Sequence, residues 1–135
     1  MDAKLKHLEF IQGTINRLST NSFLLKGWSV VLVSALFVLS GKDADLRFVW
    51  LALVPAIVVW GLDGYFLWQE RLYRKLYDRV RATHAKKINF SMETRDFLDD
   101  VGRYLKAVLS KTLIAFHGVI IATIVVVMIL LRSEG

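Results

Sequence analysis

Asp63 is an acidic residue inside an apolar and aromatic stretch, VVWGLDGYFLWQER at residues 58–71. Two more ionisable side chains have similar surroundings, Lys26 in FLLKGWSVV and His117 in LIAFHGVII. Within a membrane, such an acid, base and imidazole can neutralise one another as a fixed ion pair, or they can line a path for protons or ions. Which chemistry applies depends on the elements that hold the three side chains.

Three long apolar segments contain these residues: 23–40, 48–68 and 113–131, of 18, 21 and 19 residues. A helix needs about 20 mostly apolar residues to cross a bilayer. The whole chain is 55% hydrophobic, with a mean hydropathy of +0.45. The sequence therefore predicts an all-α membrane protein, one domain over residues 1–135, with three transmembrane helices and cytoplasmic helical extensions.

A cleaved signal peptide is the competing interpretation of the first segment. Twenty-two largely polar residues precede it, and the following SGKDADLR offers no good small-x-small cleavage site. Both observations favour a retained span. The chain contains no cysteine, which excludes disulfides, thiolate metal sites and cysteine nucleophiles.

The distribution of basic residues predicts the orientation. Residues 1–22 and 69–112 together carry fourteen Lys and Arg, whereas residues 41–47 and the tail after residue 131 carry three. By the positive-inside rule, the N-terminus is expected to be cytoplasmic and the C-terminus to face outward. The net charge of +6 fits attraction to anionic lipid, and no stacking aromatics or known module point to nucleic acid as a partner.

Two amphipathic extensions flank the first two spans. Residues 3–22 and 69–84 each carry apolar residues at steps of three and four, on one helical face. The first face consists of Leu5, Leu8, Ile11, Ile15 and Leu18, and the second of Leu72, Leu76 and Val80. Antiparallel packing of these faces would form a cytoplasmic stalk above the membrane.

The remaining connections are a turn and a further helix. GKDADLR is expected to form a tight turn opened by Gly41, and AKKINF to separate two helical elements. Ser91 is a candidate N-cap, with Glu93 in the first turn of a helix that leads into the third span. The apolar residues of that helix recur with a period near 3.5: Phe97, Val101, Tyr104 and Val108.

Depth is the feature that connects the three ionisable residues. If the second span ended before Asp63, it would be only about 22 Å long, too short for a hydrocarbon core of about 30 Å. Asp63 therefore lies about five residues inside the span, while Lys26 and His117 lie three and four residues inside theirs. All three are expected in one layer near the cytoplasmic face.

Three interpretations of this layer remain open. It can be a structural clamp that fixes helix register, Lys26 can extend alone to the interface, or the layer can line a gate or a proton or ion pathway. Pro55 is expected to kink the second span, and Gly61 and Gly64 beside the acid suit a hinge.

Oligomerisation is suggested by pairs of small residues. Ala52 and Ala56, and likewise Gly118 and Ala122, stand four residues apart and allow close approach of helices, within one monomer or between copies. Three helices cannot enclose a hydrophilic pore, so a channel requires a homo-oligomer. The mid-membrane hydroxyls of Ser34 and Thr123 are expected to bond to their own helices.

No catalytic or metal-binding motif is present. HExxH, GxSxG, a Walker loop and GxGxxG are all missing, and His7, His84 and His117 lie far apart in the sequence. Asp96, Asp99 and Asp100 share a helical face and could bind a cation, but acids near a helix N-terminus are the favoured explanation. We therefore expect no enzyme activity, no cofactor and no metal.

The stretches NSFLLKGWSVVLVSALF and GLDGYFLWQERLYRKLYD resemble a group of small bacterial inner-membrane proteins. The layout of residues 3–84, a cytoplasmic helix, a two-span hairpin and a long cytoplasmic helix, is similar to the SLATT-type two-span domains. This resemblance implies a membrane-disrupting effector of conflict and anti-phage systems. The third span departs from the two-span pattern, so the resemblance does not specify how copies assemble.

The function expected from these observations is a homo-oligomeric inner-membrane effector that forms or gates a pore. The alternative is a non-conducting anchor or adaptor, whose basic cytoplasmic helices recruit a cytosolic protein partner. A third interpretation is a subunit of a larger transporter.

Overall fold

The computed structural model describes residues 2–40 and 46–134 of the 135-residue chain, and these residues form helices and connecting segments without a strand. The elements are α1 (Asp2–Ser40), α2 (Leu46–Ala82), α3 (Leu98–Val101), α4 (Tyr104–Val108) and α5 (Lys111–Glu134), with 3₁₀ turns at Ala85–Lys87 and Arg95–Phe97. Three helices, α1, α2 and α5, are long and apolar enough to cross a membrane. The predicted all-α fold with three transmembrane helices is confirmed.

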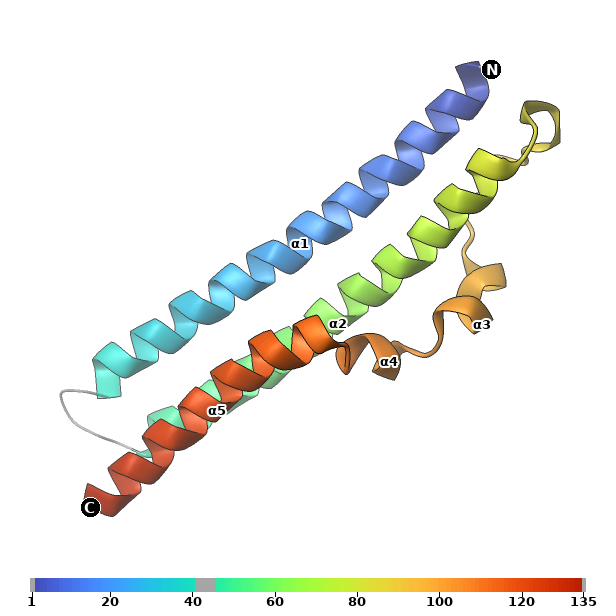
Figure 1. The fold of residues 1–135 in the computed structure, drawn as a ribbon. Helices are drawn as coiled ribbons and strands as arrows, with labels where there is room; N and C mark the ends of the chain where they lie inside the picture. Colours follow the sequence, from blue (N-terminus) through green and yellow to red (C-terminus); the bar gives the residue numbers. More distant parts are fainter. Residues whose placement is uncertain (1, 41–45, 135) are drawn as a thin grey trace.

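Helices α1 and α2 form a long antiparallel hairpin, and α5 runs beside the lower half of α2 (Figure 1). With 39 and 37 residues, α1 and α2 are each about 55–58 Å long, well beyond the thickness of a hydrocarbon core. The C-terminal end of α5 lies near the end of α1 and the start of α2 (Figure 1). Each long helix thus combines one span with a polar extension.

The extensions pack against each other as the apolar faces predict. Ile11 and Ile15 of α1 are buried against Leu72, Leu76 and Val80 of α2. Phe97 and Val101, from the segment before α5, complete this cluster, whereas Leu5 of the predicted face is 53% exposed. We call the two packed extensions, residues 2–21 and 69–94, the stalk.

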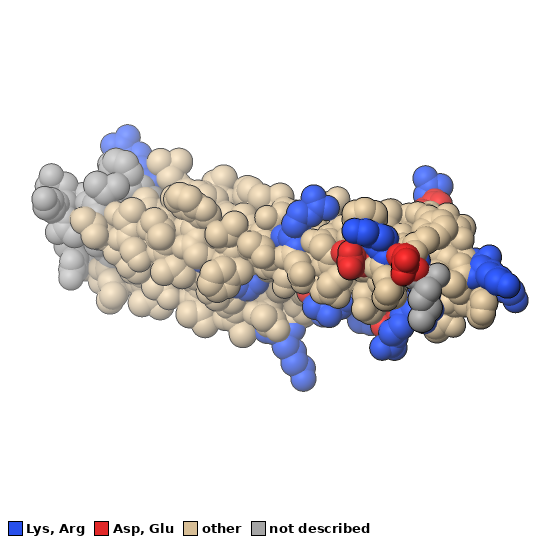
Figure 2. Space-filling view, turned by 90° about the horizontal axis from the view of Figure 1, so that it is seen from above, with Lys and Arg blue, Asp and Glu red and all other residues tan. Residues whose placement is uncertain are grey.

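The membrane half of the molecule buries much less. Its core is a strip between α2 and α5, made of Val49, Ala52 and Ala56 with Ile120 and Ile124. Most other apolar side chains of the three spans point outward, where lipid would cover them. Figure 2 shows the same division from outside, with charged side chains gathered over one half of the molecule and an almost uncharged surface over the other.

The prediction of one continuous helix from Ser91 to the third span is wrong. The Ser91 hydroxyl accepts a hydrogen bond from the Glu93 N–H (3.1 Å), which makes a local turn, and helical structure begins only at Arg95. It is interrupted again at Gly102, whose φ of +89° is a left-handed conformation that favours glycine. The interruption lets Phe97 and Val101 pack on the stalk while α4 turns toward the membrane half.

Two other expectations concern the first turn and the second span. The turn expected to open at Gly41 lies outside the described residues, and Leu46 and Arg47 already belong to α2. Helix α2 continues through Pro55, Gly61 and Gly64 without interruption.

Truncation of a stalk core residue should destabilise the stalk. Ile11→Ala or Leu72→Ala removes a side chain that is at most 1% exposed, and such changes cost about 2–5 kcal/mol. We expect faster amide hydrogen exchange over α1 residues 5–18 and over α2 residues 69–80. Phe10→Ala is the matched control, since Phe10 is 66% exposed on the same helix and its loss should leave exchange unchanged.

Candidate functional site

Asp63 is the centre of a buried polar site between three helices. Its side chain is fully buried, and Lys26 Nζ of α1 lies 2.6 Å from Oδ2. His117 Nε2 of α5 lies 2.7 Å from the same oxygen, and the Ser22 hydroxyl of α1 donates to Oδ1. Lys26 Nζ also donates to Ser22 Oγ at 2.8 Å. We call Ser22, Lys26, Asp63 and His117 the ion network.

The structure therefore brings the three residues singled out in the sequence into direct contact. Each comes from a different span, so the carboxylate joins α2 to α1 and to α5 at once. Lys26 does not extend alone to the interface, because its ammonium lies on Asp63 with 21% of the side chain exposed. An ionised carboxylate only accepts hydrogen bonds, so His117 donates to it through Nε2–H.

Aromatic rings enclose the imidazole. The Trp60 indole stacks on His117, with centroids 5.9 Å apart and ring planes 10° apart. Phe116 meets the same imidazole edge-on at 5.1 Å, and Lys26 Nζ lies 5.9 Å from the centre of the Phe116 ring. Cation–π contact and exclusion of water both strengthen the charge pairing in this region.

The sequence patterns do not identify three residues of this site: Ser22, Trp60 and Phe116. For the first two, the spacing from an ionisable residue carries a signal. Ser22 stands four residues before Lys26 and Trp60 three residues before Asp63, so each lies on the same helical face as that ionisable residue. Ser22 also lies just outside the predicted first span, which begins at residue 23, so the search for polar groups within the spans misses it.

Helix α4 packs directly against the span beside the ion network. The Trp60 Nε1–H donates to the Val108 carbonyl at 3.0 Å, and the Trp68 Nε1–H donates to the Gly102 carbonyl at 3.1 Å. The Tyr104 hydroxyl donates to the Gly61 carbonyl. A Cβ at Gly64 would lie 2.4 Å from Val108 Cγ2 and 3.1 Å from its Cα. Gly64 is thus a point of close approach, and its role as a hinge, like that of Gly61 and Pro55, stays a prediction.

The two pairs of small residues have different surroundings. Ala52 and Ala56 are 5% and 8% exposed and pack against α5 in the same chain. Ala122 is exposed, and no described atom outside the neighbouring backbone lies within 4 Å of a Cβ built at Gly118. The first pair therefore serves packing within the monomer, whereas the second faces outward.

The other candidate ligands are dispersed. His84 accepts a hydrogen bond from the Lys86 N–H through Nδ1 (3.3 Å), and Asp96 pairs with Arg79 at 3.0 Å. Asp99 and Asp100 are exposed in α3. Over residues 2–40 and 46–134, no group of three or more His, Asp or Glu side chains is arranged to hold a metal ion. The hydroxyl of Thr123 bonds to the Val119 carbonyl of its own helix (2.8 Å), as expected.

Comparison of the chain with protein-family models, with curated proteins and with solved structures found no match. The class of protein is therefore defined by the fold and the site themselves. It is an all-helical membrane protein whose three spans share one buried ion network and whose first two spans extend into a packed stalk.

Proposed function

We propose that this chain is a non-enzymatic, homo-oligomeric effector of the bacterial inner membrane that forms or gates a pore. The observation that carries the proposal is the ion network, in which the fully buried Asp63 is bound by Lys26 and His117 from the other two spans. The network would act as a lock on the closed packing. Phage defence is the biological setting that the resemblance to SLATT-type domains implies.

A lock is a better explanation than added stability. Apolar residues of similar volume often stabilise a protein as well as a buried ion pair does, whereas loss of one partner costs about 3–5 kcal/mol. A buried pair therefore contributes little net stability while both partners are present, and creates a large penalty when one leaves. Such an arrangement suits two discrete states of helix packing.

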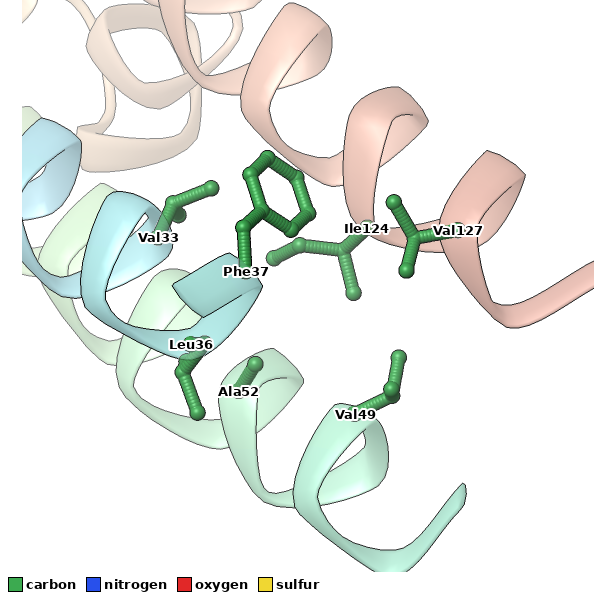
Figure 3. Close-up of a pocket in the computed structure, with 7 residues that line it drawn as sticks. All are labelled: Val33, Leu36, Phe37, Val49, Ala52, Ile124 and Val127. Carbon is green, nitrogen blue, oxygen red and sulfur yellow. The ribbon is translucent and has the colours of Figure 1, made fainter. Parts of the chain in front are cut away.

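Any ion path would have to run between copies of the chain. Among the described residues, the pocket enclosed by all three spans is lined by Val33, Leu36, Phe37, Val49, Ala52, Ile124 and Val127 (Figure 3). These apolar side chains point toward one another and leave about 10 Å³, the lower limit for one water molecule. The monomer interior is thus packed and apolar at this level.

The outward face of α5 is the proposed contact between copies. Gly118 and Ala122 lie on it with exposed neighbours such as Ile114 and Val126. Without a hydrophobic driving force in lipid, helices associate where small residues let their backbones approach closely.

This contact predicts the result of enlarging Gly118. Gly118→Leu should leave insertion and the monomer fold unchanged, because open space surrounds the position, but should reduce the oligomer mass in native gels or mass photometry. Ala35→Leu is the matched control at an exposed position of α1. An unchanged oligomer in Gly118→Leu would place the contact elsewhere.

One specific feature favours the second candidate, an adaptor. A cleft of about 640 Å³ in the stalk is lined by Lys6, His7, Phe10, Arg17 and Phe90, among others. His7 is 4% exposed, and its Nε2 has no hydrogen-bond partner among the described residues. Phe90, 5.5 Å from the His7 ring, has a φ of +59°, which is costly for a bulky residue. The basic and aromatic side chains that line this cleft suit an acidic or aromatic side chain of a cytosolic partner.

One experiment separates the two functions. Membrane potential is measured with a voltage-sensitive dye after induction of the chain alone and together with its genomic neighbour, and the chain is then purified from the same cells. Depolarisation in either culture supports the pore. An unchanged potential, together with a co-purified cytosolic protein that is lost in His7→Ala, would support the adaptor and reject the pore.

A further inference from the structure

We propose that α4 and the adjoining face of α2 form a binding site for anionic phospholipids of the membrane leaflet nearest the stalk. In the predicted orientation this is the cytoplasmic leaflet. Residues 98–109 would lie in the plane of the membrane interface, with leucines among the acyl chains and basic side chains among the headgroups. The site does not depend on whether the protein conducts ions.

The contacts of α4 place it at membrane depth. Val108 packs on Gly64 and accepts a hydrogen bond from Trp60, and both partners belong to the predicted second span. The Trp68 indole, at the end of that span, reaches the carbonyl of Gly102. Gly64 lies four residues, about 6 Å, inside the end of the span. Residues 102–108 were expected beyond the membrane, but they lie beside its boundary region.

Exposed leucines form part of the surface of this segment, beside the exposed Asp99, Asp100 and Arg103. Leu105 and Leu109 are 62% and 59% exposed, and they stand one helical turn apart on one side. Leu98 of α3 is also exposed, at 41%. Tyr65 and Trp68, typical of the aromatic belt at a membrane interface, belong to the adjacent turns of α2. Burial of these leucines among acyl chains is more favourable than their exposure to water.

Basic side chains also gather along this segment. A groove of about 390 Å³ between α2 and the α3–α4 segment is lined by Arg71, Arg74, Lys75 and Lys106, with Asp78, Asp100 and Val101. Arg71 and Arg74 stand three and six residues beyond Trp68, about 5 and 9 Å along the helix. The headgroup layer is about 5–8 Å thick, so a lipid phosphate can reach these cations.

The groove has more cations than acids, namely Arg71, Arg74, Lys75 and Lys106 against Asp78 and Asp100. Asp78 pairs with Arg81 at 3.8 Å, outside the groove, and Arg74 is bonded to Glu70 at 2.8 Å. Arg71, Lys75 and Lys106 remain directed to the groove that they line. An inorganic phosphate would use only these cations. A phospholipid would use the cations and the leucines together, and this combination makes lipid the occupant.

The depth of α4 can be measured by spin labelling, because the chain has no native cysteine. Single variants Leu105→Cys and Leu109→Cys are labelled in phosphatidylglycerol vesicles, and collision rates with oxygen and with a water-soluble nickel chelate are compared. Phe10→Cys, exposed in the stalk, and Val119→Cys, exposed in a span, give the water and acyl references. We expect the leucine labels to fall between the two references, and a profile equal to that of Phe10→Cys would overturn the proposal.

The charge requirement is tested by native mass spectrometry of the detergent-purified chain. The expected result is retention of phosphatidylglycerol over phosphatidylcholine, with no displacement by inorganic phosphate. Each basic side chain near a membrane surface changes the affinity about fivefold, so the triple variant Arg71→Gln/Lys75→Gln/Lys106→Gln should bind about 100-fold more weakly. The matched control is Lys6→Gln/Lys86→Gln/Lys87→Gln, which removes three exposed cations elsewhere in the stalk. Equal loss in both variants, no lipid preference, or displacement by phosphate would each contradict the site.

Discussion

Asp63→Asn is expected to depolarise cells at a lower expression level than the unaltered chain does. The substitution keeps the shape of the side chain but removes the charge that Lys26 meets at 2.6 Å and His117 at 2.7 Å. Lys26 is then left largely buried without its counter-charge, a situation that costs about 3–5 kcal/mol in proteins. If the ion network holds the closed packing, this penalty shifts the population toward the open state.

The measurement is dye-reported membrane potential across a series of inducer concentrations, with membrane-fraction blots to equalise expression. Asp99→Asn is the matched control, because it makes the same chemical change on an exposed residue of α3. If Asp63→Asn fails to insert, the double variant Lys26→Met/Asp63→Asn, which lacks both charges, shows whether the unpaired lysine is the cause. Depolarisation by Asp63→Asn equal to, or weaker than, that of the unaltered chain would contradict the lock.

Gly64→Ala is expected to separate α4 from α2. An added Cβ would lie 2.4 Å from Val108 Cγ2 and 3.1 Å from Val108 Cα, and distances this short force one helix to move. Overpacking of this kind costs about 1–3 kcal/mol. The loss should appear as a lower melting temperature of the detergent-purified chain and as faster hydrogen exchange at Tyr104–Val108.

Two variants make this result specific. Gly118→Ala adds the same methyl group where no described atom obstructs it, and should melt like the unaltered chain. Gly64→Ala/Val108→Ala removes the closest clashing methyl group and should recover part of the loss. If Gly64→Ala alone melts like the unaltered chain, the close packing of α4 on α2 is wrong.

The centre of the site can be predicted from the sequence, because ionisable side chains are costly within a span and three of them lie at a similar depth. Asp63, Lys26 and His117 can be linked from the sequence alone because ionisable groups in a span need partners, and each is the ionisable residue of its own span. Their supporting groups depend on neighbours that a linear sequence does not display. Gly64 packs on Val108, which is 44 positions away in the sequence. The sequence alone therefore could not distinguish a hinge at Gly64 from a site of close helix packing.

The segment before the third span shows why periodicity alone misleads. Phe97, Val101, Tyr104 and Val108 recur as on one continuous helix, but the chain breaks at Gly102. The first two residues pack on the stalk, and the last two follow α2 toward the membrane. The Trp68 indole bonds to the carbonyl freed at the break. Tertiary contacts thus override a local pattern, as they often do for short helices.

A double-mutant cycle on Lys26 and Asp63 tests the central claim most directly, namely that the two charges are paired inside the folded membrane domain. Stability is measured for the unaltered chain, Lys26→Met, Asp63→Asn and the double variant, in the same lipid-containing detergent. Each single change should destabilise the domain and the double change should cost clearly less than their sum, with a coupling of about 1–3 kcal/mol. If the loss in unfolding free energy of the double variant equals the sum of the two single losses within about 0.5 kcal/mol, the two residues do not interact and the account is contradicted.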